Sequence, residues 1–262
     1  MRKIVIFNQK GGTGKSSTAV NLSGILDTHL KKKSLVIDCD SQMNSTNYLL
    51  TCRNESYDFD LVDCVNDKDV FENAILNVAL TGRKDIPTRI SVIPGNRNVE
   101  QCDLSEFSFK PLFDKVDKKF DYCFFDCPPH ISPLTIQALS CADYVIVPAL
   151  ADTDSLSGYD LLIDTVNEIR ESAVNVELKI LGIFFNNVES NKALDRYIME
   201  SCKESMGDAV FKSSIRRTSA ISQARYYGKP ISYYKPTAPI TEDYLNLAKE
   251  LIKKISKMED RK

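Results

Sequence analysis

The residues Lys10-Gly11-Gly12-Thr13-Gly14-Lys15-Ser16-Ser17 decide the fold of this 262-residue chain. They follow an apolar run at residues 4–7, which has the length of a buried strand, and they lead into a segment with helical spacing. The glycines allow close approach of a ligand to the backbone, and positive φ angles that a side chain would disfavour. A strand, a glycine-rich loop with Gly-Lys-Ser and a helix, in this order, predict a phosphate-binding loop.

Two lysines and two serines give this loop its chemistry. Lys15 is placed to offset the charge of the β- and γ-phosphates of a nucleoside triphosphate, and Ser16 to join the shell of a Mg²⁺ ion. Ser17 is placed to contact the α-phosphate. The usual pattern has a glycine five residues before Gly14, but Gln9 stands there and a second lysine follows it. The loop is therefore a deviant one, and its predicted nucleotide-binding residues are Lys10, Gly11, Gly12, Thr13, Gly14, Lys15, Ser16 and Ser17.

Short apolar runs alternate with longer segments of helical spacing along the chain. The runs predict strands buried on both faces, at residues 4–7, 35–37, 90–93, 122–125, 144–147 and 178–185. The longer segments predict helices, at residues 16–30, 61–80, 107–120, 133–139, 156–169, 192–205 and about 241–258. This order predicts an α/β fold, a doubly wound, mostly parallel sheet with helices on both faces. No linker-like segment interrupts it, so we predict a single domain over residues 1–262.

The composition is that of a soluble globular protein, with 43% hydrophobic and 27% charged residues. It disfavours disorder, collagen and a long coiled coil, and no apolar stretch is long enough to cross a membrane. The eight cysteines form no C-x-x-C pair, and we interpret them as reduced, mostly structural thiols. The net charge of −2 is unevenly distributed: residues 1–178 carry 18 basic and 26 acidic side chains, and residues 179–262 carry 16 and 10.

Three aspartates follow predicted strands at the edge where an open parallel sheet binds ligands. Asp38 and Asp40 come after the strand at residues 35–37, and alternation along an extended chain sends both to the same side. Two like charges there need a cation nearby, which Mg²⁺ and its waters would supply. Asp126 ends the strand at residues 122–125, in the arrangement that holds a magnesium-bound water beside phosphates. An aspartate at a strand end is otherwise usually a turn residue.

These motifs resemble those of the ParA/MinD group of deviant Walker A ATPases, and most closely those of the Soj-like ParA partition ATPases, over essentially the whole chain. The resemblance implies P-loop NTPase chemistry and an ATP-dependent homodimer in which Lys10 reaches the partner's phosphates. Residues 38–44 are similar to the family's D-x-D-P-Q-x-N segment, with Ser41 in place of proline. The catalytic residues that the resemblance implies are Lys10, Lys15 and Asp40. Of these, Asp40 orients or deprotonates the attacking water. The implied metal-site residues are Ser16, Asp38 and Asp126, and the implied cofactors are ATP and Mg²⁺.

Two further polar positions have alternative interpretations. Asp152 and Asp154 resemble a family segment that faces the partner subunit, but either carboxylate equally suits the cap of the predicted helix that follows. Asn186 lies where related enzymes recognise adenine, although asparagine at a strand end also commonly forms turns. We include Asn186 among the predicted nucleotide-binding residues.

Residues 209–241 contain six basic side chains and no acidic one, which indicates a surface that faces a polyanion. The segment is similar to a DNA-contacting region of the family, but Asn191 and Ala220 stand where the family has its DNA-contacting arginines. The family's arginine contacts with DNA can therefore not be assigned to these two positions. We predict instead that charge alone binds DNA phosphates nonspecifically; the alternative is an ordinary solvated face. The predicted DNA-binding residues are Lys192, Arg216, Arg217 and Arg225.

The resemblance implies a role in plasmid or chromosome partition. ATP would close the dimer on nucleoid or plasmid DNA, and a ParB-like centromere-binding protein would stimulate hydrolysis and release. We expect a cytoplasmic, nucleoid-associated ATPase without stable membrane association. One alternative is a MinD-like spatial regulator held on a membrane by the helix at about 241–258, although its apolar stripe equally suits docking on a sheet. Another is a reductase similar to the nitrogenase iron protein, with Cys127 near a cluster ligand position.

Overall fold

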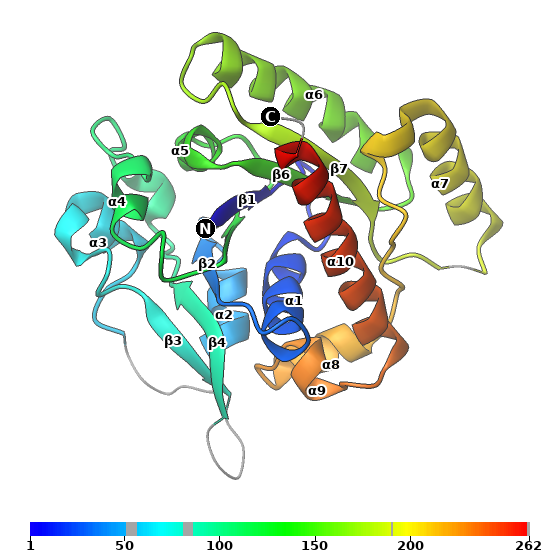
Figure 1. Ribbon diagram of the computed structural model, residues 1–262, viewed down its shortest axis with the longest axis horizontal. Helices are drawn as coiled ribbons and strands as arrows, with labels where there is room; N and C mark the ends of the chain where they lie inside the picture. Colours follow the sequence, from blue (N-terminus) through cyan, green and yellow to red (C-terminus); the bar gives the residue numbers. More distant parts are fainter. Residues whose placement is uncertain (51–56, 81–85, 190, 261–262) are drawn as a thin grey trace.

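A seven-stranded sheet lies between two layers of helices (Figure 1). The computed structural model describes residues 1–50, 57–80, 86–189 and 191–260. The strand order is β3-β4-β2-β5-β1-β6-β7, and every neighbouring pair is parallel except β3 and β4. The predicted fold class is thus confirmed. The strands are β1 Arg2–Ile6, β2 Ser34–Asp38, β3 Leu76–Leu80, β4 Ile86–Ile93, β5 Tyr122–Asp126, β6 Tyr144–Ala149 and β7 Lys179–Phe185.

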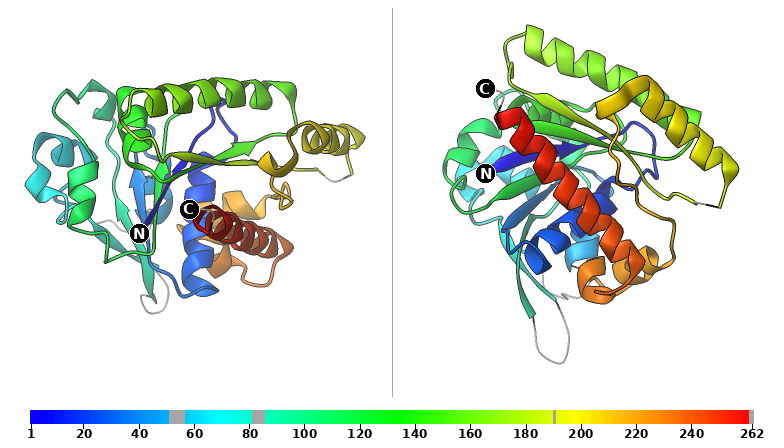
Figure 2. Two further views of the ribbon diagram at one scale, coloured as in Figure 1. Left: turned by 45° about the horizontal axis from the view of Figure 1, so that its top comes forward. Right: turned by 45° about the vertical axis from the view of Figure 1, so that its right-hand side comes forward.

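Alternate strand residues face opposite layers of helices, as the pleat requires. In β1, Ile4 and Ile6 pack into the core on the α1 side, whereas Val5 packs into the core on the α5 and α6 side. Figure 2 shows α1 and α10 on one side of the sheet and α6 on the other.

The helices are α1 Lys15–Thr28, α2 Asn44–Leu50, α3 Leu61–Asn66, α4 Lys110–Asp114, α5 Pro133–Cys141, α6 Thr153–Glu171, α7 Ala193–Met206, α8 Ala220–Tyr226, α9 Ile231–Tyr234 and α10 Pro239–Glu259. Turns of 3-10 helix lie at Lys68–Val70, Val99–Gln101 and Gly207–Ala209.

The predicted helix at residues 61–80 is wrong. Its first part forms α3, capped by Asp60, whose side chain accepts hydrogen bonds from two backbone N–H groups of the first turn. Its last part forms β3, which pairs antiparallel with β4. Val78 and Leu80 alternate with more exposed residues and are buried, which is the period of a strand and not of a helix. The predicted helix at 107–120 is also shorter, since α4 spans five residues.

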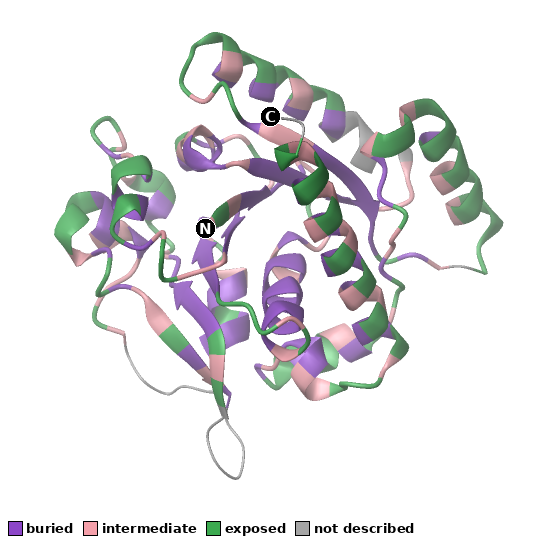
Figure 3. Cartoon of the chain, viewed as in Figure 1, coloured by how far each residue is buried: buried purple, intermediate pink, exposed green. Residues whose placement is uncertain are grey.

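The last helix docks on the sheet, in agreement with one of its two sequence interpretations. Its apolar stripe, which includes Tyr244, Leu247, Leu251 and Ile255, is buried in the core shared with α1. Figure 3 shows this helix as a mixture of buried and exposed residues, whereas the strands and α1 are mostly buried. No helix among the described residues is long and apolar enough to cross a membrane.

The β7 edge of the sheet is covered by the chain that leads from α7 to α8. Phe211 N–H donates to the Ile183 carbonyl at 2.7 Å, and Ile215 N–H donates to the Phe185 carbonyl at 2.8 Å. Gly182 makes this approach possible, because a Cβ there would lie 2.0 Å from the carbonyl oxygen of Ala209 and its φ is 130°. The covering segment thus uses hydrogen-bonding groups that an edge strand would otherwise leave open.

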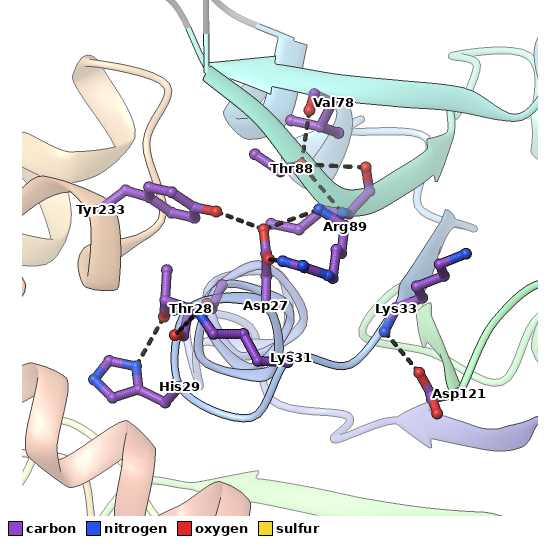
Figure 4. A network of polar contacts seen from close by, with 12 residues as sticks. Asp27, Thr28, His29, Lys31, Lys33, Val78, Thr88, Arg89, Asp121 and Tyr233 are labelled. Atoms are coloured by element: carbon purple, nitrogen blue, oxygen red, sulfur yellow. Dashed lines mark hydrogen bonds and ion pairs between the residues drawn. The ribbon is translucent and has the colours of Figure 1, made fainter.

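A buried carboxylate joins α1 to the elements on either side of it (Figure 4). Asp27, 2% exposed, accepts hydrogen bonds from the backbone N–H of Arg89 at 2.9 Å and from its guanidinium at 3.1 Å. The hydroxyl of Tyr233 donates to the same carboxylate at 2.5 Å. The three contacts connect α1 with β4 and α9, so they hold the helix that follows the phosphate loop from its far end.

Candidate nucleotide site

The glycine loop lies between β1 and α1, at the carboxyl edge of the parallel strands. Gly12 and Gly14 have φ angles of 77° and 90°, which favour glycine. A Cβ at Gly14 would also lie 2.1 Å from the side-chain nitrogen of Asn186. The backbone thus takes the shape that the sequence predicted, and α1 begins at Lys15, directly after Gly14.

Lys15 is folded back over the loop. Its Nζ donates to the carbonyl oxygens of Asn8 at 2.9 Å and Lys10 at 3.3 Å, and the residue is 7% exposed. Burial lowers the pKa of Lys15, and the nearby carboxylates of Asp126 and Asp40 act in the opposite direction. A positive charge that is shielded from water at the glycine loop suits a phosphate.

Lys10 is paired within its own chain. Its Nζ lies 2.8 Å from Oδ2 of Asp152, which directly precedes α6. Both side chains are about one third exposed. The structure therefore gives Asp152 a contact with the phosphate loop that the sequence did not indicate, while the side chain of Asp154 lies outside the described residues.

Asp38 is held in the sheet edge by three donors. Its Oδ2 accepts hydrogen bonds from the backbone N–H of Thr46 at 2.8 Å and from the Thr46 hydroxyl at 2.7 Å, and its Oδ1 accepts from the N–H of Asp40 at 3.2 Å. Burial, followed by the charge of Asp126, raises the pKa of Asp38 to about 8. Without a cation, burial therefore favours the protonated form of this carboxyl group.

Asp126 pairs with Asp38 in the register of β2 and β5. Burial raises its pKa to about 6, and the hydroxyls of Ser45 and Ser16 act in the opposite direction. Its Oδ2 accepts a hydrogen bond from Ser45 at 2.6 Å, whereas its buried Oδ1 has no hydrogen-bond partner among the residues that the structure describes. A buried carboxylate oxygen without a partner, beside a second carboxyl group, fits a hydrated cation.

Asp40 lies beside this pair, 5% exposed, with its Oδ1 accepting from the N–H of Gln42 at 2.9 Å. The structure thus brings together the predicted residues Lys15, Ser16, Asp38, Asp40 and Asp126. Local sequence patterns did not indicate the supporting residues, which are Asn8, Ser45 and Thr46. Ser45 and Thr46 lie on α2, a short helix that the sequence did not predict.

Asn186 contacts the loop itself. Its side-chain nitrogen donates to the carbonyl oxygen of Thr13 at 2.7 Å, and both residues are buried. The contact fixes the loop against the end of β7. Asn186 is thus placed to position the phosphate loop, and its predicted contact with adenine stays a prediction.

The predicted DNA-binding residues are engaged in contacts with other parts of the chain. Arg216 makes two hydrogen bonds with Asp243, at 2.6 and 2.7 Å. Arg217 and Lys192 both lie within 2.6 Å of Glu189. The guanidinium of Arg225 donates to the side-chain oxygen of Asn44, the first residue of α2, at 2.6 Å. The acidic partners come from outside residues 209–241 and offset part of the charge that the sequence indicated.

A parallel sheet with this loop, lysine and pair of strand-end aspartates defines a P-loop nucleoside triphosphatase. Residues 1–180 match the AAA domain family model AAA_31. The chain belongs to the Soj/ParA family of partition ATPases. It is 33% identical to the sporulation initiation inhibitor protein Soj of Bacillus subtilis, over 95% of this chain and 97% of that protein. It is 30% identical to the chromosome-partitioning ATPase Soj of Thermus thermophilus, over 97% of each chain.

Solved structures share this fold at lower identity. Apo McdA from Cyanothece has a TM-score of 0.79 at 22% identity, covering 96% of this chain and 99% of that one. A plasmid partition protein from Borrelia burgdorferi bound to AMPPNP has a TM-score of 0.79 at 21% identity, covering 97% and 100%. MinD from Pyrococcus horikoshii with Mg-ADP has a TM-score of 0.76 at 22% identity, covering 95% of each chain. These likenesses agree with the fold.

Proposed function

We propose that this ATPase is a DNA-bound partition switch, which closes as a homodimer on ATP and opens after hydrolysis. The main support for the proposal is that two features lie together at one edge of the sheet. One is the deviant phosphate loop with its second lysine, and the other is the group of carboxyl groups of Asp38, Asp40 and Asp126. The names of the relatives, which are partition proteins and chromosome-partitioning ATPases, support the cellular role.

The residues of this chain divide the chemistry among them. Lys15 offsets charge on the β- and γ-phosphates, and the Lys10 of a second copy adds a further positive charge once it leaves Asp152. Asp40 orients the attacking water and accepts its proton. Ser16, Asp38 and Asp126 would hold Mg²⁺ and its waters, and the ion supplies charge stabilisation when bound. Solved relatives that contain AMPPNP or Mg-ADP support ATP and Mg²⁺ as cofactors.

In this proposal the closed dimer binds DNA without reading its sequence, and a ParB-like centromere-binding protein accelerates hydrolysis. The protein would then be cytoplasmic and associated with the nucleoid. The buried apolar stripe of α10 argues against the MinD-like alternative, because a membrane-bound helix needs that stripe on its surface. Cys127 is fully buried, which argues against a cluster ligand at a subunit interface.

Two measurements on the same preparations test the proposal. Light scattering should find dimers with a non-hydrolysable ATP analogue and monomers with ADP, and a DNA mobility assay should find a shift in the first state alone. Lys15→Ala should lose both responses. Equal DNA shifts with ATP, with ADP and with the Lys15→Ala variant would contradict a switch, and monomers in every nucleotide state would contradict the dimer.

A further inference from the structure

A groove of about 750 Å³ runs between α10 and the segment that leads from α7 to α8. Both views of Figure 2 and Figure 1 show these two parts of the chain side by side. Three lysines of α10 line the groove at intervals of four residues, so they lie in one row along the helix, each about 6 Å further along its axis. The lysines that line the groove are Lys212, Lys249, Lys253, Lys254 and Lys257.

The acidic side chains of the groove offset little of this charge. Asp243 is paired with the guanidinium of Arg216. Glu250 accepts hydrogen bonds from two successive backbone N–H groups, at 2.8 Å each, and from the hydroxyl of Ser213 at 2.7 Å. Asp208 is the remaining carboxylate on the groove wall. Two of the three carboxylates are thus already satisfied by donors other than the lysines.

The lysines themselves fall into two kinds. Lys254 is structural: its Nζ donates to the carbonyl oxygen of Leu181 at 3.2 Å and lies 4.6 Å from the centre of the Phe211 ring. Burial lowers the pKa of Lys254. The other four are exposed, and within the described part of the chain their ammonium groups make no ion pair and no hydrogen bond: Lys212, Lys249, Lys253 and Lys257.

This arrangement differs from that of the arginines that the sequence singled out. Arg216 and Arg217 must give up a carboxylate partner before they meet a phosphate, whereas the four lysines need only give up water. Unpaired cations in a row therefore present the stronger attraction to a polyanion.

We propose that Lys212, Lys249, Lys253 and Lys257, the lysine groove, bind the phosphates of duplex DNA without reading its sequence. The inference rests on the proposed DNA-binding function and names the surface that performs it. Phosphates of one strand follow each other about every 3.4 Å along the duplex, so a spacing of about 6 Å between lysines is close to every second phosphate. The row is long enough for several such contacts, and ammonium groups contact phosphate as point charges without base specificity.

An anionic membrane is the other polyanion to consider, and the structure disfavours it. A helix that lies in a membrane interface needs an exposed apolar face beside its charges. The apolar face of α10 is buried in the core. Among the described residues, none of the large hydrophobic side chains that are exposed lies on α10.

A triple variant tests the groove: Lys249→Gln, Lys253→Gln and Lys257→Gln together. The matched control is the triple variant Lys110→Gln, Lys118→Gln and Lys203→Gln, which removes the same amount of positive charge. These three lysines are exposed and do not line the groove, and among the described residues they form no ion pair. Anisotropy of a labelled DNA duplex, with a non-hydrolysable ATP analogue over a salt series, should show at least about a tenfold loss of affinity for the groove variant. Its slope of log affinity against log salt should fall by about 0.9 for each phosphate that the variant no longer neutralises. The control should bind as the wild type does.

Each other outcome would overturn the inference in a recognisable way. If the wild type and the groove variant bind DNA with the same affinity and slope, DNA binding stands and the groove is the wrong surface. If the control loses as much affinity as the groove variant, net charge explains the effect. If the groove variant keeps DNA binding but no longer sediments with phosphatidylglycerol vesicles that the wild type binds, the groove serves lipid. If the wild type binds no DNA in any nucleotide state, the proposed DNA function fails first.

Discussion

The ammonium group of Lys10 lies 2.8 Å from the carboxylate of Asp152 in the same chain. A lysine that acts on the nucleotide of a second copy must leave this partner first. The ion pair is partly exposed, and pairs of this kind contribute about 0.2–1 kcal/mol. In the ATP dimer proposed above, Asp152 would therefore oppose closure by a small, measurable amount in each protomer.

Asp152→Asn should favour the ATP dimer. Because 1 kcal/mol is about a fivefold change in an equilibrium constant, we expect the dimer dissociation constant to fall by up to about fivefold for each protomer that releases its Lys10. Analytical ultracentrifugation with a non-hydrolysable ATP analogue measures it, with Lys10→Ala as the comparison. An Asp152→Asn protein with a weaker dimer would show that Asp152 supports the interface and does not restrain Lys10.

Asp40→Ala should separate ATP binding from hydrolysis. Among the described residues the Asp40 carboxylate accepts its one hydrogen bond from the Gln42 N–H, and the backbone bonds of Asp40 remain in an alanine variant, so the variant should bind ATP and accumulate as dimer. Its hydrolysis rate should fall by about 10²–10⁴, the usual contribution of a positioned base. Nucleotide affinity by calorimetry and phosphate release by a coupled assay report the two properties. Loss of nucleotide binding would contradict the role assigned to Asp40.

The raised pKa values of Asp38 and Asp126 predict a pH dependence of stability without metal. A carboxyl group with a raised pKa stabilises the fold while it is protonated, and that contribution is lost as the pH rises through the folded-state pKa. The loss runs from about pH 4 upward and ends near pH 8, the pKa of Asp38. Between pH 6 and 8 the free energy of unfolding should therefore fall as the pH rises, because the folded protein loses a proton that the unfolded chain has already lost.

Urea denaturation of the protein without nucleotide or magnesium, compared with Asp38→Asn, isolates this dependence. The asparagine keeps an acceptor for the two Thr46 donors and does not titrate. The difference in unfolding free energy between the two proteins should therefore change with pH in the stated window. A constant difference from about pH 5 to 9 would mean that Asp38 is ionised in the metal-free protein.

Asn186→Ala should weaken the binding of every nucleoside triphosphate alike. Without its hydrogen bond to the Thr13 carbonyl the loop is looser while the base site is unchanged, and such a bond contributes about 1 kcal/mol, or about fivefold in affinity. Titrations with fluorescent ATP and GTP analogues measure the ratio. If the variant bound only the ATP analogue more weakly, Asn186 would instead take part in recognition of the adenine base.

Tyr233→Phe and Asp27→Asn should destabilise the fold by different amounts. Removing the tyrosine hydroxyl takes one donor from Asp27 and should cost about 1 kcal/mol. Replacing the buried carboxylate also leaves the guanidinium of Arg89 without its charged partner, and should cost about 2–3 kcal/mol. Urea denaturation gives both values. Equal costs would mean that Arg89 contributes nothing through its charge.

The sequence predicted the parts of this molecule whose signals are local. The loop at residues 10–17 lies between a strand and a helix, and Asp38 and Asp126 end apolar runs, so their shared sheet edge follows from strand order alone. Ser45 and Thr46 were missed because their helix is only seven residues long and has no apolar period of its own. Their importance comes from the carboxyl groups that they meet across the fold.

Contacts between distant parts of the chain could not be predicted. Lys10 and Asp152 are 142 positions apart, and nothing near either one indicates the other. The run of basic side chains at residues 209–241 indicated free positive charge, yet Glu189 and Asp243 offset part of it. The prediction of one helix at residues 61–80 was wrong for a different reason. A helix and a strand of similar hydrophobicity follow each other there, and no glycine or proline between them marks the boundary.

The chain that lies along β7 has a consequence for how copies of this protein meet. The backbone N–H groups of Phe211 and Ile215 already donate to the carbonyl oxygens of Ile183 and Phe185, so these acceptors on the outer border of β7 are not open for another molecule to extend the sheet. Association by strand addition is closed off there, as is runaway polymerisation into ribbons from that border. Copies of this protein that meet at the β7 border therefore have to do so through side chains.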